Sequence, residues 1–572
     1  MKVFYKKEIK PDEIITSQLL VDLILNQRQI KDKKEFLNPK SPLKISLFNF
    51  DEKYKKSFEK IITLFENIKK NNQMIVVYTD YDADGITGGA ILWETLYLLG
   101  FKVMPYVPER TKEGYGFSIK GIDNVIKNFN PALIISVDHG ITKIKEVRYA
   151  KKKGIKIIIT DHHLKTDQTP EAEAIFHIPK LSGSGVAYFF AKEVFNQLYN
   201  SVKKQGEKND LIKLIKLEKN FSTDYLALAS IGTIADLVPL TDQSRSIVKY
   251  GLEAFSKTKR TGLVEILKQA GVYGKKIAPY EIGFIIAPRI NAVGRLKHSL
   301  DALRLLCTID NNRASKLAHQ IGSLNIQRQD LVEKSVDEAK KIVDKCKLDQ
   351  NKIIILNSNT WHEGIIGLIA SKITEEYYRP TIILTKTDGY YKASARSITS
   401  FHITNFLRSL KSYLVDVGGH SQAAGFTIEE NKLELFKKTV LDKANQLIKD
   451  KDLERVIEAD LKIPLSKINL QLAKTLESLA PYGIGNPQPT FFSQGKLINA
   501  KLFGKKNQHL KILVNDINQS STNEPLELIS FNQSSLFPHL SRHQHLQIVY
   551  TLEIERWKEK EKVRGKVVKI CS

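Results

Sequence analysis

Residues 74–89 limit what this chain can fold into more than any other stretch. A short apolar run ends there in three alternating carboxylates, Asp80, Asp82 and Asp84, and an apolar pattern of helical period follows as far as Leu99. A bounded β-branched run followed by a helical pattern predicts a buried parallel strand that leads into a crossover helix. Because ligands in open α/β sheets lie beyond the carboxyl ends of the strands, the aspartates would stand at a binding edge.

Two explanations of these aspartates are open at this point. Three carboxylates so close together cannot all ionise cheaply without a cation between them, and hard oxygen ligands at that density suit Mg²⁺ or Mn²⁺. The alternative is an acidic turn whose aspartates cap the next helix, which is the commoner explanation of a lone Asp-x-Asp. Recurrence of the pattern further along the chain favours the metal site.

Two later strands repeat the design. One buried run ends at Asp138-His139-Gly140 and the next ends at Asp161-His162-His163. The carboxyl ends of parallel strands meet at one edge, and neutral imidazole beside carboxylates suits Mn²⁺. We interpret His162 as a ligand, Asp161 as the carboxylate that orients it, and His163 as a contact to a phosphate or leaving group. The sequence leaves open which histidine has which role.

A further carboxylate interrupts the apolar segment 232–240. Asp236 would be costly to bury there unless it were paired or bound to a metal. It is therefore a candidate for the last ligand.

The charge of the chain points to a polyanionic partner. The 572 residues include 88 Lys and Arg against 63 Asp and Glu, a net charge of +25. Nucleic acid is the usual partner of such a chain, although a solvated Lys-rich surface is the alternative. Cysteines are few and widely spaced, which argues against disulfides or a zinc site. With no signal-peptide pattern and no membrane-length apolar run, we expect a cytoplasmic protein without a membrane partner.

The second half of the chain reads as two further domains. Apolar residues at helical period over 302–348 predict helices, the last of them long. An α/β unit follows, in which the pair Ser394 and Arg396 and the glycine-rich segment around Gly419 and His420 are suited to bind phosphate at a strand–helix turn. From residue 455 short β-like runs with polar turns predict a small barrel, and an OB-fold is the natural choice.

These motifs together resemble the DHH phosphoesterase superfamily. The order and spacing of Asp80-Tyr81-Asp82-Ala83-Asp84-Gly85, Asp138-His139-Gly140, Asp161-His162-His163 and Ala235-Asp236 carry the resemblance. Within the superfamily the chain resembles the RecJ family of single-strand-specific exonucleases nearly end to end, for instance at Phe36-Leu37-Asn38-Pro39 and over 287–295. His139 departs from the family pattern, either as an added contact or as a tolerated residue.

The resemblance implies a fold of α/β class. A parallel-sheet DHH domain would be joined by a long helix to a second α/β domain, the DHH-associated domain, and followed by a C-terminal barrel of OB type. The expected divisions are 1–50 for an N-terminal lead-in, 51–300 for the DHH domain, 301–349 for connecting helices, 350–450 for the DHH-associated domain and 455–572 for the OB-fold.

The resemblance also implies hydrolysis of single-stranded DNA from the 5′ end by a site with two ions, Mn²⁺ or Mg²⁺. The expected ligands are Asp82, Asp84, Asp138, His162 and Asp236, with Asp138 best placed to bridge. Asp80 is a further ligand or a neighbouring acceptor. The expected phosphate contacts, besides the segments already named, are Arg110, Arg289 and Arg295. Tyr115 and Trp361 are candidates either for base stacking or for a role in the core.

Partners implied by the resemblance alone are a RecQ-type helicase and a single-strand-binding protein. Two rival functions remain. One is another DHH hydrolase, acting on short oligoribonucleotides or cyclic dinucleotides, which would need neither the barrel nor the basic charge. The other is a non-catalytic single-strand-binding scaffold, which would be expected to have lost metal ligands.

Overall fold

The structure is a computed structural model and describes residues 3–10, 12–109, 113–114, 116–205, 208–517, 524–540, 545–558 and 560–571. These residues form two compact units. One comprises mainly residues 323–457, together with 295–297. The other comprises residues 3–294, 298–322 and 458–571 as far as they are described.

The first sheet of the larger unit is parallel throughout and has the strand order β3-β2-β4-β5-β6. The strands predicted before Asp80, Asp138 and Asp161 are confirmed. Strand β3 contains Pro105 and lies at the edge of the sheet, where a missing N–H is tolerated. The last strand was not predicted. The strands are β2 Ile75–Thr79, β3 Val103–Tyr106, β4 Leu133–Val137, β5 Lys156–Asp161 and β6 Ala174–His177.

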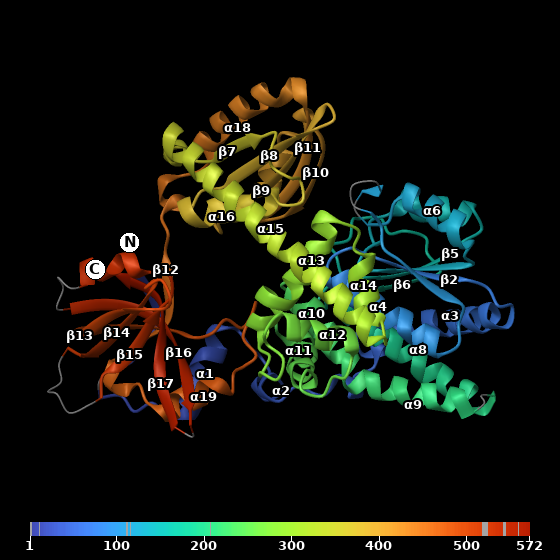
Figure 1. Ribbon diagram of the computed structural model, residues 1–572, viewed down its shortest axis with the longest axis horizontal. Helices are drawn as coiled ribbons and strands as arrows, with labels where there is room; N and C mark the ends of the chain where they lie inside the picture. The colour runs from blue at the N-terminus through green and yellow to red at the C-terminus, as the bar shows by residue number, and fades with distance from the viewer. Residues whose placement is uncertain are drawn as a thin grey trace. The chain divides into compact units, whose positions relative to one another are not determined.

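Helices cover both faces of this sheet (Figure 1). The larger core joins the sheet to α3, α4, α8 and α10, and a smaller core joins it to α6 and α7. A Cβ on Gly89 would lie 2.1 Å from Thr79 Cγ2, so glycine allows α4 to pack directly on β2. The helices are α3 Lys53–Lys70, α4 Ala83–Leu98, α6 Ile119–Phe129, α7 Ile144–Lys152, α8 Gly183–Gln205, α9 Lys208–Ser222, α10 Asp224–Ala235, α11 Asp242–Ala254 and α12 Thr261–Gln269.

The chain then leaves this core through three more helical segments and a long helix. A π-helical segment, Glu281–Ile286, runs directly into α13, Ala287–Leu296, and α14 spans Leu300–Cys307. The predicted long helix is confirmed as α15, Asn311–Cys346, whose first part belongs to the larger unit and whose remainder belongs to the smaller.

The smaller unit is a five-stranded mixed sheet with the order β10-β11-β9-β8-β7. Separate apolar clusters pack α17 and α18 with the sheet and α16 with the end of α15. The elements are β7 Ile354–Ser358, α16 Ile366–Tyr377, β8 Thr381–Thr387, β9 Tyr390–Arg396, α17 Ile403–Arg408, β10 Leu414–His420, β11 Ala423–Glu429 and α18 Leu433–Leu447.

The C-terminal part of the larger unit is the predicted barrel. Strands β13, β14, β15, β17 and β16 pair in that order, and β13 also pairs with β16, which closes the five strands into a ring. The strands are β12 Ile457–Lys462, β13 Thr490–Phe503, β14 His509–Asp516, β15 Leu526–Ser530, β16 His545–Trp557 and β17 Lys560–Cys571, with α19 Leu470–Glu477 and α20 Phe537–Leu540.

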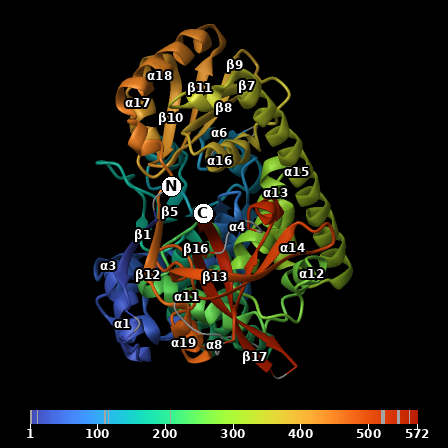
Figure 2. The ribbon, with the colours of Figure 1, turned by 90° about the vertical axis from the view of Figure 1, so that its left-hand side faces the viewer.

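The N-terminal lead-in begins with a strand that the sequence did not predict. Strand β1, Val3–Glu8, lies beside β12 and extends the barrel sheet (Figure 2). The helices α1, Ser17–Gln27, and α2, Lys33–Leu37, contribute apolar side chains to the barrel core rather than to the neighbouring parallel-sheet core. Because this packing joins residues more than 400 positions apart, local periodicity carried no signal of it.

None of the helices in the described part of the chain is long and apolar enough to cross a membrane.

Candidate metal centre

The loop that follows β2 is held by the N-termini of two helices. Asp82 is the N-cap of α4, and its Oδ1 accepts hydrogen bonds from the backbone N–H groups of Asp84 and Gly85 at 3.0 and 3.1 Å. Asp84 accepts from the first two residues of α8, Gly183 at 2.6 Å and Ser184 at 2.9 Å. The N-terminal partial positive charge of a helix favours a carboxylate at both places.

The ends of β4 and β5 bring the next groups to the same edge. Asp138 is buried and has a left-handed backbone conformation with φ of 67°. Its N–H donates to Thr160 O, which fixes the turn after β4 against β5. Asp161 is buried as well, and its Oδ2 accepts from the N–H of Ile141 at 2.9 Å. The side chains that the sequence placed at one edge therefore do meet there.

The imidazole of His162 lies among three carboxylates. Its Nε2 is 3.1 Å from Asp138 Oδ1, 3.4 Å from Asp236 Oδ2 and 3.9 Å from Asp84 Oδ2. Asp236 reaches this position because it is the C-cap residue of α10. Burial lowers the pKa of His162, which favours the neutral ring that a metal ligand requires.

Asp161 holds His163 and not His162. Its Oδ1 is 2.8 Å from His163 Nδ1, whereas it contacts His162 only through the backbone N–H. Although burial acts in the opposite direction, this pairing raises the pKa of His163 to about 9 and lowers that of Asp161. The predicted pairing of Asp161 with His162 therefore differs from the geometry, because the side chain of Asp161 turns toward the second histidine.

Two groups of potential ligands share no residue. The ligand atoms of Asp80, Asp82 and Asp138 lie within 4.8 Å of one another, and so do those of Asp84, His162 and Asp236. Asp138 also forms a third such group with His162 and His163. Asp80, whose role the sequence left open, thus lies among the potential ligands. These groups offer enough ligands to hold two divalent ions.

The charges of the centre fit cations as well. Burial, and then the neighbouring carboxylates, raise the pKa values of Asp82, Asp138 and Asp236, the last to about 8. Among the described residues neither Asp138 Oδ1 nor His162 Nε2 has a hydrogen-bond partner, although both are buried. Buried carboxylates and an unpartnered imidazole nitrogen are costly unless a cation pairs with them.

The remaining predicted contacts fall into both units. In the larger unit, Nη1 of Arg289 donates to Ile285 O at 2.6 Å, and its buried Nε has no hydrogen-bond partner in the described structure. In the smaller unit, Nη1 of Arg295 donates to Gly364 O at 2.9 Å. Arg396 Nη1 donates to Ser394 Oγ at 3.1 Å.

Arg396 and Ser394 lie against the N-terminus of α16. A Cβ on Gly367 would stand 3.0 Å from both Arg396 Nη2 and Ser394 Oγ. A guanidinium, a hydroxyl and a helix N-terminus in contact form a place suited to phosphate.

Three predictions in this region need comment. Gly419 and His420 lie at the end of β10 in a hairpin to β11 and not at a strand–helix turn, so any phosphate contact would use strand backbone. Trp361 is buried and donates to Glu338, so it is a packing residue and not a stacking surface. Arg110 and Tyr115 lie outside the described residues.

His139 is enclosed by aromatic rings. It stacks on Phe117 and meets Tyr78 edge to face, and burial lowers its pKa to about 3. Of the two options left open by the sequence, packing is the one that this environment supports.

Two contributors to the centre were missed. Asn291 of α13 accepts from the N–H of Ala83 at 2.7 Å and so fixes the aspartate loop, and the first turn of α8 binds Asp84. Both segments carry a visible signal: Asn291 follows a proline–arginine motif, and Gly183 opens a helix in a Ser-Gly-Ser-Gly run. Neither signal says which loop the segment contacts.

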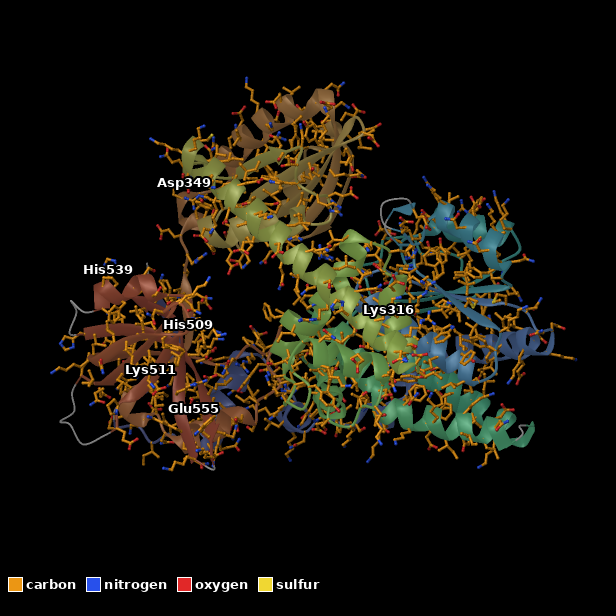
Figure 3. All side chains as sticks on the ribbon, viewed as in Figure 1. Lys316, Asp349, His509, Lys511, His539 and Glu555 are labelled. Atoms are coloured by element: carbon orange, nitrogen blue, oxygen red, sulfur yellow. The ribbon has the colours of Figure 1, made fainter. Side chains whose placement is uncertain are left out.

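The barrel carries an aromatic and basic surface of its own. His509 lies between Phe503 and Phe531, at ring-centroid distances of 5.1 and 5.2 Å, and Lys566 stands over Phe531. Figure 3 shows His509 and Lys511 on the barrel strands. Aromatic rings beside lysines are typical of surfaces that bind single-stranded nucleic acid.

The fold and the centre together define a metal-dependent hydrolase of the DHH class. The family model described as the DHH family N-terminal domain matches residues 74–233, that of the DHHA1 domain matches 350–446, and that of the RecJ OB domain matches 459–569. The chain belongs to the RecJ family.

Relatives and solved structures agree with this assignment. The single-stranded-DNA-specific exonuclease RecJ of Haemophilus influenzae is 30% identical, and the match covers 97% of each chain. RecJ of Bacillus subtilis is 33% identical over 86% of this chain, which spans only 60% of that longer protein. RecJ of Thermus thermophilus in complex with Mn²⁺ has a TM-score of 0.79 at 26% identity and covers all of this chain and 80% of its own.

Proposed function

We propose that the protein is an exonuclease that hydrolyses the phosphodiester bonds of single-stranded DNA, 5′ to 3′, and releases 5′-mononucleotides. The observation that carries the proposal is a pair of ligand groups that share no residue and could hold two ions. One consists of Asp80, Asp82 and Asp138, and the other of Asp84, His162 and Asp236. Two divalent ions bound there would supply an activated water and neutralise charge on the attacking and leaving oxygens.

The side chains of the centre have separate tasks in this proposal. Asp82, Asp84, Asp138, His162 and Asp236 hold the cations, and the two helix N-termini fix the first two of these carboxylates. Asp161 fixes the ring of His163, which can then contact a phosphoryl or leaving oxygen. Preorganised groups of this kind contribute by avoiding reorganisation during the reaction.

The smaller unit would hold the terminal phosphate. Arg396, Ser394 and the N-terminus of α16 offer a charged fork, a hydroxyl and backbone N–H groups to one anion. Burial lowers the pKa of the Arg396 guanidinium, so a bound phosphate would repay the cost of its burial. A 5′-phosphate requirement would follow from this site.

The test uses purified protein with Mn²⁺ and oligonucleotides labelled at either end, with duplex DNA and RNA in parallel. We expect mononucleotides from the 5′ end of single-stranded DNA and no release by the Asp138→Ala variant. Tight strand binding without cleavage by the unmodified protein would contradict the proposal and support a scaffold. Cleavage confined to very short RNA would support an oligoribonuclease. A RecQ-type helicase and a single-strand-binding protein remain proposed partners, testable by pull-down with the purified proteins.

A further inference from the structure

An exposed aromatic pair lies beside the metal centre without any assigned role. Tyr280 and Phe284 stack with ring centroids 5.0 Å apart and planes inclined by 26°. Their exposed fractions are 59% and 71%, so the solvent covers most of both rings. The packing of the same segment is provided by Ile282 and Ile286, which are fully buried. Packing of the core therefore does not account for the presence of two aromatic side chains at these positions.

The backbone beneath the pair is unusual. Phe284 lies in the π-helical segment Glu281–Ile286, which Tyr280 precedes as N-cap. A π-turn widens a helix, costs hydrogen-bond quality and is found frequently at functional sites. Here it precedes α13 directly, so the position of the aromatic pair is fixed relative to the residues that α13 presents.

The residues of α13 lie close to the loop after β2 that carries Asp80, Asp82 and Asp84. Asn291 of α13 binds the N–H of Ala83, and a Cβ on Gly283 would touch Ile234, which lies in α10 two residues before Asp236. Seven helical residues separate Phe284 from Asn291, a rise of about 10 Å. Between them lies Arg289, whose buried Nε has no hydrogen-bond partner in the described structure.

On its other side the pair borders a basic hollow. Tyr280 lines a hollow of about 930 Å³ together with Lys249, Lys257, Lys275, Lys276 and, from the connector to the barrel, Pro481. Glu253 is the acidic residue among its lining residues. Lys249 donates to Leu37 O, whereas no ion pair within 4.0 Å is found for the other three lysines in the described structure.

We propose that Tyr280 and Phe284 form a base-stacking platform, and that the lysines of the adjoining hollow hold the phosphates of the same single strand as it runs from the metal centre toward the barrel. Every base has a π-face, so stacking on these rings accepts any sequence, and lysines follow the backbone. A stacked pair alone would be an ordinary surface feature, but one that adjoins a lysine-lined hollow and precedes a half-buried arginine in the same helical stretch has the composition of a strand path.

The platform rests on the proposed function and adds to it a dependence on strand length. A dinucleotide would be cleaved without reaching the platform, whereas a longer strand would gain affinity there. Hydrolysis of a dinucleotide tests the proposed function, and binding of a longer strand tests the platform. The two proposals can therefore fail independently of each other.

The experiment compares Tyr280→Ala/Phe284→Ala with a matched control, Tyr97→Ala. Tyr97 is 57% exposed and stacks on Trp93 four residues earlier, but it does not line the hollow. Binding of fluorescein-labelled, 5′-phosphorylated dT20 is measured by anisotropy in an Asp138→Ala background, and hydrolysis of 5′-phosphorylated dT2 and dT20 is measured in the active protein.

We expect the double variant to bind dT20 about tenfold more weakly, because one or two bases lose their stacking contact, and we expect no change in the control. Hydrolysis of dT2 should stay within twofold of the unmodified protein. Unchanged dT20 affinity would overturn the platform, and so would an equal loss of dT2 and dT20 hydrolysis, because the pair would then only support the metal centre. If the unmodified protein binds dT20 but cleaves neither substrate, the proposed exonuclease activity is refuted and the platform is not.

The lysines are tested through salt dependence. Each phosphate contact on a single strand contributes about 0.7 to the slope of log affinity against log salt, so Lys275→Ala/Lys276→Ala should make the slope shallower by about 1.4. Lys55→Ala/Lys56→Ala, an adjacent exposed pair on α3, is the matched control and should leave the slope unchanged. Equal slopes in both variants would exclude the hollow from the strand path.

Discussion

Substitution of Gly183 by alanine should inactivate the metal centre while leaving the fold intact. Gly183 is the first residue of α8, and a Cβ there would lie 2.4 Å from both Cβ and Oδ1 of Asp138. Ordinary van der Waals contact begins at 3.4 Å, so one side must move by about 1 Å. Because α8 also binds Asp84 through Gly183 N–H, the displacement would reach both groups of potential ligands.

A misplacement of about 1 Å costs roughly 10²-fold in rate, or about 2.7 kcal/mol of transition-state stabilisation at 1.36 kcal/mol per tenfold. The assay is kcat/KM for mononucleotide release from a 5′-phosphorylated oligonucleotide at saturating Mn²⁺, with Mn²⁺ affinity measured by calorimetry. We expect kcat/KM to fall about 100-fold and Mn²⁺ affinity to fall with it.

Gly185→Ala is the control because it lies in the same turn. Its Cβ would approach Ile247 Cδ1, a flexible side-chain end, at 3.2 Å and Leu181 Cβ at 3.3 Å, so shifts of a few tenths of an ångström suffice. Both variants gain helix propensity of at most about 1 kcal/mol, whereas the displaced Asp138 costs Gly183→Ala about 1–3 kcal/mol, so its thermal stability should fall slightly and that of the control should not. Full activity of Gly183→Ala, or an equal loss in both variants, would refute the assignment of Asp138 to the centre.

Three further predictions concern pH, the barrel and its connector. The folded-state pKa of Asp236, about 8, exceeds its unfolded value, so the metal-free protein should lose stability as the pH rises from about 4 to 8. Thermal denaturation in EDTA measures this dependence, and the Asp236→Asn variant should show a flatter one. A stability that rises with pH over this range would contradict the prediction. Phe531→Ala should weaken the binding of long single strands about fivefold or more, as measured by anisotropy, and should leave the rate of dinucleotide cleavage unchanged. An unchanged affinity would show that the barrel surface does not contact the strand. Arg245→Met should lower the free energy of unfolding by about 3–5 kcal/mol, since the buried guanidinium donates to the carbonyls of Phe36, Leu479, Ala480 and Pro481. Limited chymotrypsin digestion should then cut first after Tyr482, in the connector 480–487 that leads to the barrel, and an unchanged digestion pattern would contradict this.

Much of the fold could be predicted from local pattern. The strands before Asp80, Asp138 and Asp161 are short β-branched runs, and their ends meet because parallel strands present one edge. The long helix and the barrel strands were predictable for the same reason. Packing between distant segments was not: β1, α1 and α2 join the barrel core, and nothing in their own periodicity distinguishes that core from the nearer one.

The centre was predictable in composition but not in its internal contacts. Motif order identified the carboxylates and histidines, whereas the pairing of Asp161 with His163 depends on a side-chain direction that two adjacent histidines leave open. The exposed pair at Tyr280 and Phe284 carried no sequence signal, because two aromatic residues four positions apart in a helix do not by themselves show whether their face is buried or exposed.

Helix capping and metal binding, which the sequence presented as alternatives for the first aspartates, are compatible in this structure. Asp82 uses one oxygen to cap α4, which leaves the other oxygen for a cation. Asp84 caps α8 with both oxygens and still lies 3.9 Å from His162 Nε2. Each carboxylate oxygen has two lone pairs, so a backbone N–H and a cation can share one oxygen. The two helix N-termini place positive potential beside these carboxylates and fix their positions before any cation binds, which is what a preorganised centre requires.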